Sequence, residues 1–197
     1  MITEIDHECS VLCVVSTDED NEVCKAFGFE TLFYPNDPLG RKLNAGCLLA
    51  LTDSPDYLMT MNSDSVVRKE LFDYYKPYFE RREKYFGVDR LTFVDSQTGQ
   101  AKDYTYDFTI LGVAKCIRAD VVAESFHALG CFYPDNQNRG LDNKMMDNMI
   151  RIKAWPVMVQ YGGQLVFDVK SEINIWPYSH FKNRGKEVKS ELCYKAG

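Results

Sequence analysis

The sequence predicts an α/β protein with a mixed central sheet flanked by helices and a small antiparallel portion. Residues 9–61 alternate apolar runs of strand length with helix-like segments, which is typical of a parallel sheet covered by helices. Residues 91–111 instead place two strand-like runs around a Ser-Gln-Thr-Gly turn, which predicts an antiparallel hairpin. The chain of 197 residues is long enough for one core, so we expect a single domain over 1–182 and a basic polar tail over 183–197.

The first third of the chain carries the parallel part of this pattern. Its first segment is a continuous Val-rich run, and the acidic residues that follow it predict a loop able to cap a helix. Gly28 and the Ser54-Pro55 pair are typical helix stops, and Pro35 closes the second strand. We therefore expect strands at 9–16, 29–34 and 57–61, and helices at 23–27 and 43–52.

The rest of the chain is expected to combine further helices with short strands. An aromatic, charged segment with Pro77 in it predicts an interrupted helix, and Gly130 marks the end of a second one. A polar loop at 133–140 precedes a third helix, which has Leu141, Met145 and Met149 on one stripe. The predicted helices are 70–86, 119–129 and 141–152, and the predicted strands are 91–95, 104–111, 113–118 and two within 157–175.

Composition limits the classes of partner. A formal net charge of −6 argues against a general nucleic-acid coat or an anionic membrane surface, so an anionic ligand would need local Lys, Arg or metal. The 7 cysteines form no Cys-x-x-Cys pair, which favours reduced thiols over a disulfide framework or a zinc knuckle. No segment approaches the roughly 20 apolar residues that cross a bilayer. We expect a cytoplasmic protein without membrane insertion.

The most informative stretch places a cationic Gly/Asn segment, residues 36–46, one helix before a strand that ends at Asp64. Arg41 and Lys42 can offset phosphate charge, and Asp64 offers carboxylate oxygens to a hard divalent cation. This arrangement fits a diphosphate held by a metal ion. Two other interpretations stay open, because Gly-Arg-Lys also fits a plain helix start and residues 62–64 also fit a turn after a strand.

With these segments in place, the chain resembles a GT-A glycosyltransferase, in particular the small family-2-like transferases of bacteria and viruses. The matching segments occur in the family's order. They are Val11 to Asp18 as strand and acidic loop, Gly40 to Gly46 as the sugar-nucleotide loop, Asn62-Ser63-Asp64 as the metal motif, Gly112 to Ala114 as the acceptor-side strand, and Gly140-Leu141-Asp142 as the catalytic acid segment.

The resemblance implies a metal-dependent inverting transfer of a sugar from a nucleoside diphosphate donor to an acceptor hydroxyl. In that family Mn²⁺ or Mg²⁺ bridges the diphosphate to an Asp-x-Asp motif, whose first acid is replaced here by Asn62. The implied roles are general base for Asp142, metal ligands for Asp64 and His180, and donor binding for Thr17, Asp18, Arg41, Lys42, Asn44, Asn62 and Ser63. The acceptor, which is a glycan, a protein or a modified nucleic-acid base, is left open, as is a viral source with a location in the host cytoplasm.

Three alternatives accompany this expectation. Family members normally begin with another strand and helix, for which residues 1–7 are too few, so a non-catalytic interaction protein on a degenerate transferase scaffold is one of them. A nucleotidyltransferase is the second, although such enzymes normally keep two acids for their metals. Asp142 also fits a third, purely structural role, because an acid in the first turn of a helix is favoured by the helix dipole.

Overall fold

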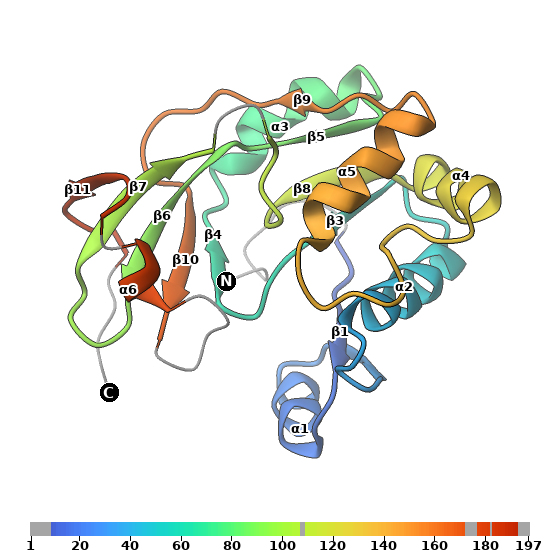
Figure 1. The fold of residues 1–197 in the computed structure, drawn as a ribbon, viewed down its shortest axis with the longest axis horizontal. Helices are drawn as coiled ribbons and strands as arrows, with labels where there is room; N and C mark the ends of the chain where they lie inside the picture. The colour runs from blue at the N-terminus through green and yellow to red at the C-terminus, as the bar shows by residue number, and fades with distance from the viewer. Residues whose placement is uncertain (1–8, 107–108, 172–176, 182, 193–197) are drawn as a thin grey trace. The chain divides into compact units, whose positions relative to one another are not determined.

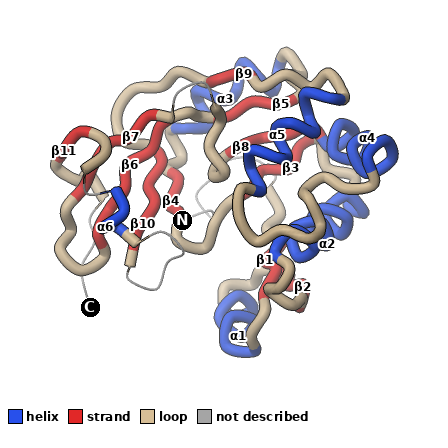
Figure 2. The backbone as a smooth tube through the Cα atoms, in the orientation of Figure 1, coloured by secondary structure: helices blue, strands red, loops and turns tan. Residues whose placement is uncertain are grey.

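The computed structural model describes residues 9–106, 109–171, 177–181 and 183–192. Figures 1 and 2 show an α/β fold of mixed sheets and helices, which confirms the predicted fold class. The chain divides into two compact units. Unit 1 contains the described residues of 59–116 and 157–192, and unit 2 contains residues 9–58 and 117–156. Each unit therefore combines segments from two distant parts of the chain.

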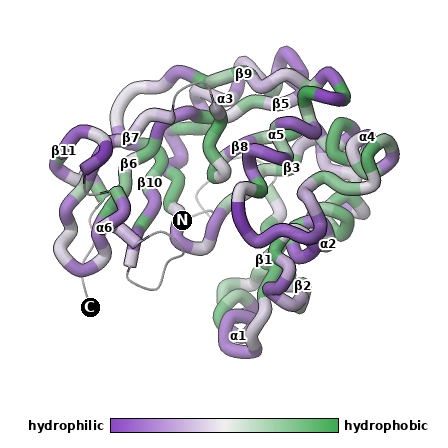
Figure 3. The backbone as a smooth tube through the Cα atoms, in the orientation of Figure 1, coloured by the Kyte–Doolittle hydropathy of each residue, from purple (hydrophilic) through white to green (hydrophobic). Residues whose placement is uncertain are grey.

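Unit 2 contains the predicted parallel strands. Strand β1 (Leu12–Val15) pairs in parallel with β2 (Glu30–Phe33), and the chain connects them through α1 (Asp18–Ala26). Helix α2 (Leu39–Ala50) and the short 3-10 helix η2 (Leu51–Asp53) follow, and α4 (Ala119–Leu129) and α5 (Leu141–Arg151) complete the unit. Figure 3 shows β1 as hydrophobic and α1 as mainly hydrophilic, which agrees with the absence of buried residues in α1 among those described.

Helix α2 packs closely against β1 because position 46 is a glycine. A Cβ atom on Gly46 would lie 2.5 Å from Cγ2 of Val14, which is closer than two carbon atoms approach. Helix α2 also begins earlier than the sequence predicts. Pro38 has an extended backbone and precedes the first helical residue, so Gly40, Arg41 and Lys42 lie in the first turn of a helix instead of in a loop.

The acidic run after β1 also differs from its prediction as a loop. Thr17 is the N-cap of α1, and its side-chain oxygen accepts a hydrogen bond from the backbone N–H of Asp20. Asp18, Glu19 and Asp20 therefore lie in the first turn of α1, where the helix dipole favours acids.

Unit 1 is built on a five-stranded sheet of order β11-β7-β6-β10-β4. Strands β6 and β10 are parallel, and the other neighbours are antiparallel. The predicted hairpin is confirmed by the β6–β7 pair, although its second strand begins earlier than expected. The bounds are β4 (Ser65–Val67), β6 (Arg90–Asp95), β7 (Ala101–Thr105), β10 (Val166–Lys170) and β11 (Lys186–Val188). Strand β11 lies in the segment predicted as a polar tail, where it pairs with β7 as the edge strand of the sheet.

An aromatic cluster fixes the other elements of unit 1. Phe86 of β5 (Tyr85–Gly87) contacts three rings of α3 (Leu71–Glu80), and the hydroxyl of Tyr75 donates to the carbonyl of Ala114 at 2.6 Å. Pro77 lies inside α3 without ending it. Strand β9 (Val157–Met158) pairs in parallel with β5, and α6 (Tyr178–Phe181) follows β10.

Strands β3 (Tyr57–Thr60) and β8 (Lys115–Arg118) have residues in both units and belong to a four-stranded sheet of order β3-β8-β5-β9. Among the described residues, every helix is too short or too polar to cross a bilayer. The predicted elements at 104–111 and 157–175 extend into residues that lie outside the described ranges.

Candidate functional site

The side chain of Lys42 lies at the carboxyl ends of the two parallel strands of unit 2. Its Nζ donates to Oγ of Ser16, which follows β1, at 2.9 Å, and to Oδ1 of Asn36, which follows β2, at 3.3 Å. Oγ of Ser16 in turn donates to the carbonyl of Tyr34 at 2.8 Å, so the hydroxyl is oriented. Ligands of open α/β sheets bind at this edge of the strands.

Among the described residues, neutral side chains are the hydrogen-bond acceptors of the Lys42 ammonium. Both of its hydrogen-bond partners are neutral, and it forms no ion pair with a carboxylate in the part of the chain that the structure describes. Partial burial lowers the pKa of Lys42 below its ordinary value, and the nearby charge of Asp20 opposes that shift. Because neutral acceptors do not neutralise an ammonium, its positive charge can attract an anionic ligand.

The first turn of α2 is bound to the polar loop that precedes α5. The backbone N–H of Leu39 donates to Oδ1 of Asn138 at 2.6 Å, and the backbone N–H of Gly40 donates to the carbonyl of Gln137 at 2.9 Å. Nη2 of Arg41 donates to Oδ1 of Asn136 at 3.3 Å. Two segments that the sequence singled out, 36–46 and 133–142, are therefore brought together within unit 2.

Asn44 is the buried centre of this contact. It is 4% exposed, and its Nδ2 donates to the carbonyl of Tyr133 at 2.8 Å and to Oδ1 of Asp135 at 2.7 Å. Its Oδ1 accepts from the backbone N–H of Tyr133 at 2.8 Å. A Cβ atom on Gly40 would lie 1.9 Å from the carbonyl oxygen of Pro134, so this approach also requires a glycine. The structure gives Asn44 a positioning role for the loop, away from solvent.

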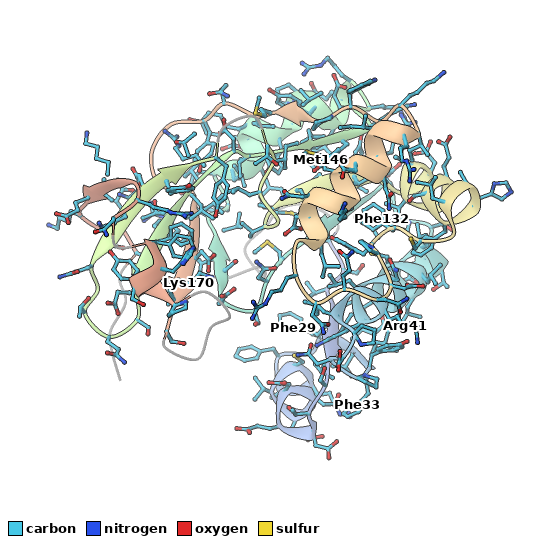
Figure 4. All side chains as sticks on the ribbon, viewed as in Figure 1. Phe29, Phe33, Arg41, Phe132, Met146 and Lys170 are labelled. Carbon is cyan, nitrogen blue, oxygen red and sulfur yellow. The ribbon has the colours of Figure 1, made fainter. Side chains whose placement is uncertain are left out.

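The remaining unit 2 candidates are at the surface. Arg41, labelled in Figure 4, is exposed, as are Thr17 and Asp18 at the start of α1. Asp142 is exposed in the first turn of α5, directly after the loop that binds α2. Because the backbone N–H groups of Leu39 and Gly40 are already bonded, an anion at this edge would be bound by side chains instead of by the start of α2.

The predicted metal motif lies in unit 1. Residues 62–65 form a turn closed by a hydrogen bond from the N–H of Ser65 to the carbonyl of Asn62 at 3.2 Å, as the alternative interpretation of this motif expects. Asn62 and Ser63 are exposed. Oδ2 of Asp64 lies 3.1 Å from Nζ of Lys170 on β10, so its carboxylate is already paired with an ammonium.

The carboxylate of Asp64 shares its ammonium partner with a second carboxylate. Lys170 also lies 2.8 Å from Oδ1 of Asp168, so one ammonium serves two carboxylates. No group of three or more His, Cys, Asp or Glu side chains suited to a metal ion occurs in the described ranges. His180 is exposed on α6, where its ring contacts the neighbouring ring of Phe181 at 5.0 Å. A role for Mn²⁺ or Mg²⁺ at Asp64 and His180 stays a prediction.

Four residues of these two clusters were missed by sequence reasoning: Ser16, Asn36, Asp168 and Lys170. Ser16 directly follows β1, and Asn36 comes three positions after the last residue of β2. The last two alternate with apolar residues in Val166–Lys170, which places both charges on one face of β10. Burial raises the pKa of the Asp168 carboxyl to about 6, the nearby Asp64 adds to that rise, and Lys170 opposes it.

No family model and no curated protein sequence matches the chain. Fourteen chains of solved structures match its fold. One is residues 1–349 of TarS, a glycosyltransferase of S. aureus, with a TM-score of 0.58 and 14% sequence identity over 85% of this chain and 54% of that chain. The fold is glycosyltransferase-like. The chain spans about half the length of the TarS chain it matches, and assignment to family 2 and a viral source stay predictions.

Proposed function

We propose that the protein is a glycosyltransferase that binds its nucleoside diphosphate sugar at the carboxyl ends of β1 and β2. The observation that carries this proposal is the ammonium of Lys42, which Ser16 and Asn36 hold there and which forms no ion pair among the described residues. The glycosyltransferase-like fold supports the class of reaction. Transfer of a sugar leaves a nucleoside diphosphate whose negative charge grows as the glycosidic bond breaks, and a positioned cation stabilises that charge.

In this proposal each of the surface residues of unit 2 has one task. Lys42 and Arg41 bind the diphosphate, and Asp18 and the adjacent Thr17 form hydrogen bonds with the nucleoside. Asp142 acts as the general base of an inverting reaction, in which it removes the proton of the acceptor hydroxyl as that oxygen bonds to the anomeric carbon. Asn44 contacts no substrate and holds the loop that leads to Asp142.

Calorimetric titration of the purified protein with UDP and GDP tests the donor site. We expect one of the two nucleotides to bind, and Lys42→Met to weaken its binding about tenfold or more, because a charge-assisted contact to phosphate is lost. Lys25→Met is the matched control, since Lys25 is an exposed lysine of the same unit that pairs with Glu22 at 3.8 Å. The nucleotide affinity of Lys25→Met should equal that of the wild type.

The outcomes separate the candidate functions. Binding of a nucleotide together with slow hydrolysis of the corresponding nucleotide sugar supports a transferase. Binding without turnover of any nucleotide sugar or any acceptor would favour the non-catalytic interaction protein. If neither nucleotide binds, or if Lys42→Met binds as tightly as the wild type, the proposed donor site is wrong.

A further inference from the structure

A single buried lysine holds two carboxylates together on one face of the sheet of unit 1. Nζ of Lys170 lies 3.1 Å from Oδ2 of Asp64 and 2.8 Å from Oδ1 of Asp168. The Lys170 side chain is 10% exposed and that of Asp168 is 9% exposed, so this ammonium is removed from bulk water. A charge buried to this extent is stable only with partners of opposite sign.

A third oxygen faces the same cluster from the neighbouring strand. Ser65 of β4 is the register partner of Asp168 on β10, which places the two side chains on the same face of the sheet. Among the described side chains, Oγ of Ser65 is buried without a hydrogen-bond partner, whereas the buried Oδ1 of Asp168 lies 2.8 Å from the ammonium of Lys170. The Ser65 hydroxyl is thus available to join the two carboxylates in coordinating a cation in place of the ammonium.

The backbone fixes this set of oxygens. The N–H of Val169 donates to the carbonyl of Asp64 at 2.8 Å, which ties the turn before β4 to β10. Lys170 is enclosed on its other side, where its Nζ lies 5.9 Å from the ring centroid of Phe93, and Phe93 stacks on Phe181 of α6 at 3.9 Å. The oxygens are therefore preorganised around the position that the ammonium occupies.

Carboxylate and hydroxyl oxygens are the ligands that Mg²⁺, Mn²⁺ and Ca²⁺ prefer, but an ammonium already neutralises the carboxylates here. We propose that Lys170 is the resident cation of the Asp64 cluster and excludes a divalent metal ion from it. Replacing Lys170 by a short neutral residue converts Asp64, Asp168 and Ser65 into a divalent-cation site. The consequence for catalysis, that sugar transfer proceeds without added metal, rests on the proposed function.

Titration of the full chain with Mn²⁺ at neutral pH, with free Mn²⁺ measured by electron paramagnetic resonance, tests the proposal without any nucleotide. Lys170→Ser should gain one Mn²⁺ site at this cluster, and the wild type should bind Mn²⁺ there at least about tenfold more weakly than this variant does. Adding Asp64→Asn to that variant should remove the new site. Lys102→Ser is the matched control, because Lys102 is a buried lysine of the same sheet that pairs with the exposed Glu187, and this variant should gain no Mn²⁺ site.

Two results would overturn the proposal. One is Mn²⁺ binding by the wild type that Asp64→Asn abolishes, because Lys170 then does not exclude the metal. The other is a folded Lys170→Ser protein, judged by circular dichroism, that gains no site. If that variant does not fold, Lys170→Gln replaces it, since its amide oxygen adds a ligand and the same gain is expected. Failure of UDP to bind affects only the proposed donor site, because this assay contains no nucleotide.

Discussion

Asn44→Ala is expected to lower the free energy of unfolding of the protein by about 3 kcal/mol. The variant loses the hydrogen bonds of the Asn44 side chain, and two buried backbone groups lose that side chain as a partner. Asn44 is 4% exposed, and its carboxamide satisfies both the N–H and the carbonyl of Tyr133. Tyr133 is itself buried, at 2% exposed, so water does not replace those partners without opening the contact between α2 and the loop. Denaturation by urea at neutral pH measures the loss.

Asn143→Ala is the control for this prediction. Asn143 is exposed on α5 in the same unit, and alanine is the better helix former, so its effect should stay within about 0.5 kcal/mol of the wild type. The same denaturation curves decide the matter. Equal midpoints for Asn44→Ala and Asn143→Ala would show that the loop does not depend on the buried amide.

The parallel part of the fold was predictable because its signals are local. Val-rich runs of strand length, a glycine after a helix and a proline after a strand each act within a few residues, and β1, β2 and β3 lie close to the predicted positions. The start of α2 was not predictable in this way. The turn at Gly40 is helical because its N–H groups bind residues of a loop nearly a hundred positions away, a contact that no local pattern contains.

In the candidate site, too, local signals were predictable and long-range contacts were not. Lys42 was singled out from its position, whereas its partners Ser16 and Asn36 are recognised only once the two strand ends lie side by side. Asp64 was predicted to hold a metal ion from its place after the segment of Arg41 and Lys42, without knowledge of its partner in the fold. The pairing of Asp64 with Lys170 spans 106 positions and depends on the register of β10 against β4, which the sequence does not reveal.

Asp142→Asn is expected to lower the rate of sugar transfer about 100-fold or more while leaving nucleotide affinity unchanged, because general base catalysis is lost and the donor contacts are not. The change keeps the shape of the side chain, and an amide does not accept the proton of the acceptor hydroxyl. Asp142 lies in the first turn of α5 at the surface, so a folded variant is expected with at most a small loss from the helix dipole. Single-turnover transfer from the nucleotide sugar that binds, compared with calorimetric affinity for the nucleotide, separates the two effects.

Asp147→Asn provides the comparison, since Asp147 is also exposed on α5 and carries the same charge further along the helix. If Asp142 is the base, the Asp147 variant should retain the wild-type rate. Similar losses of the transfer rate in both variants would indicate that the rate depends on the charge of the helix surface. It would then not depend on one positioned carboxylate. A wild-type rate in Asp142→Asn together with a large loss in Asp147→Asn would assign the base to Asp147, five positions later on the same helix. The proposed binding of the donor at Lys42 would be unaffected.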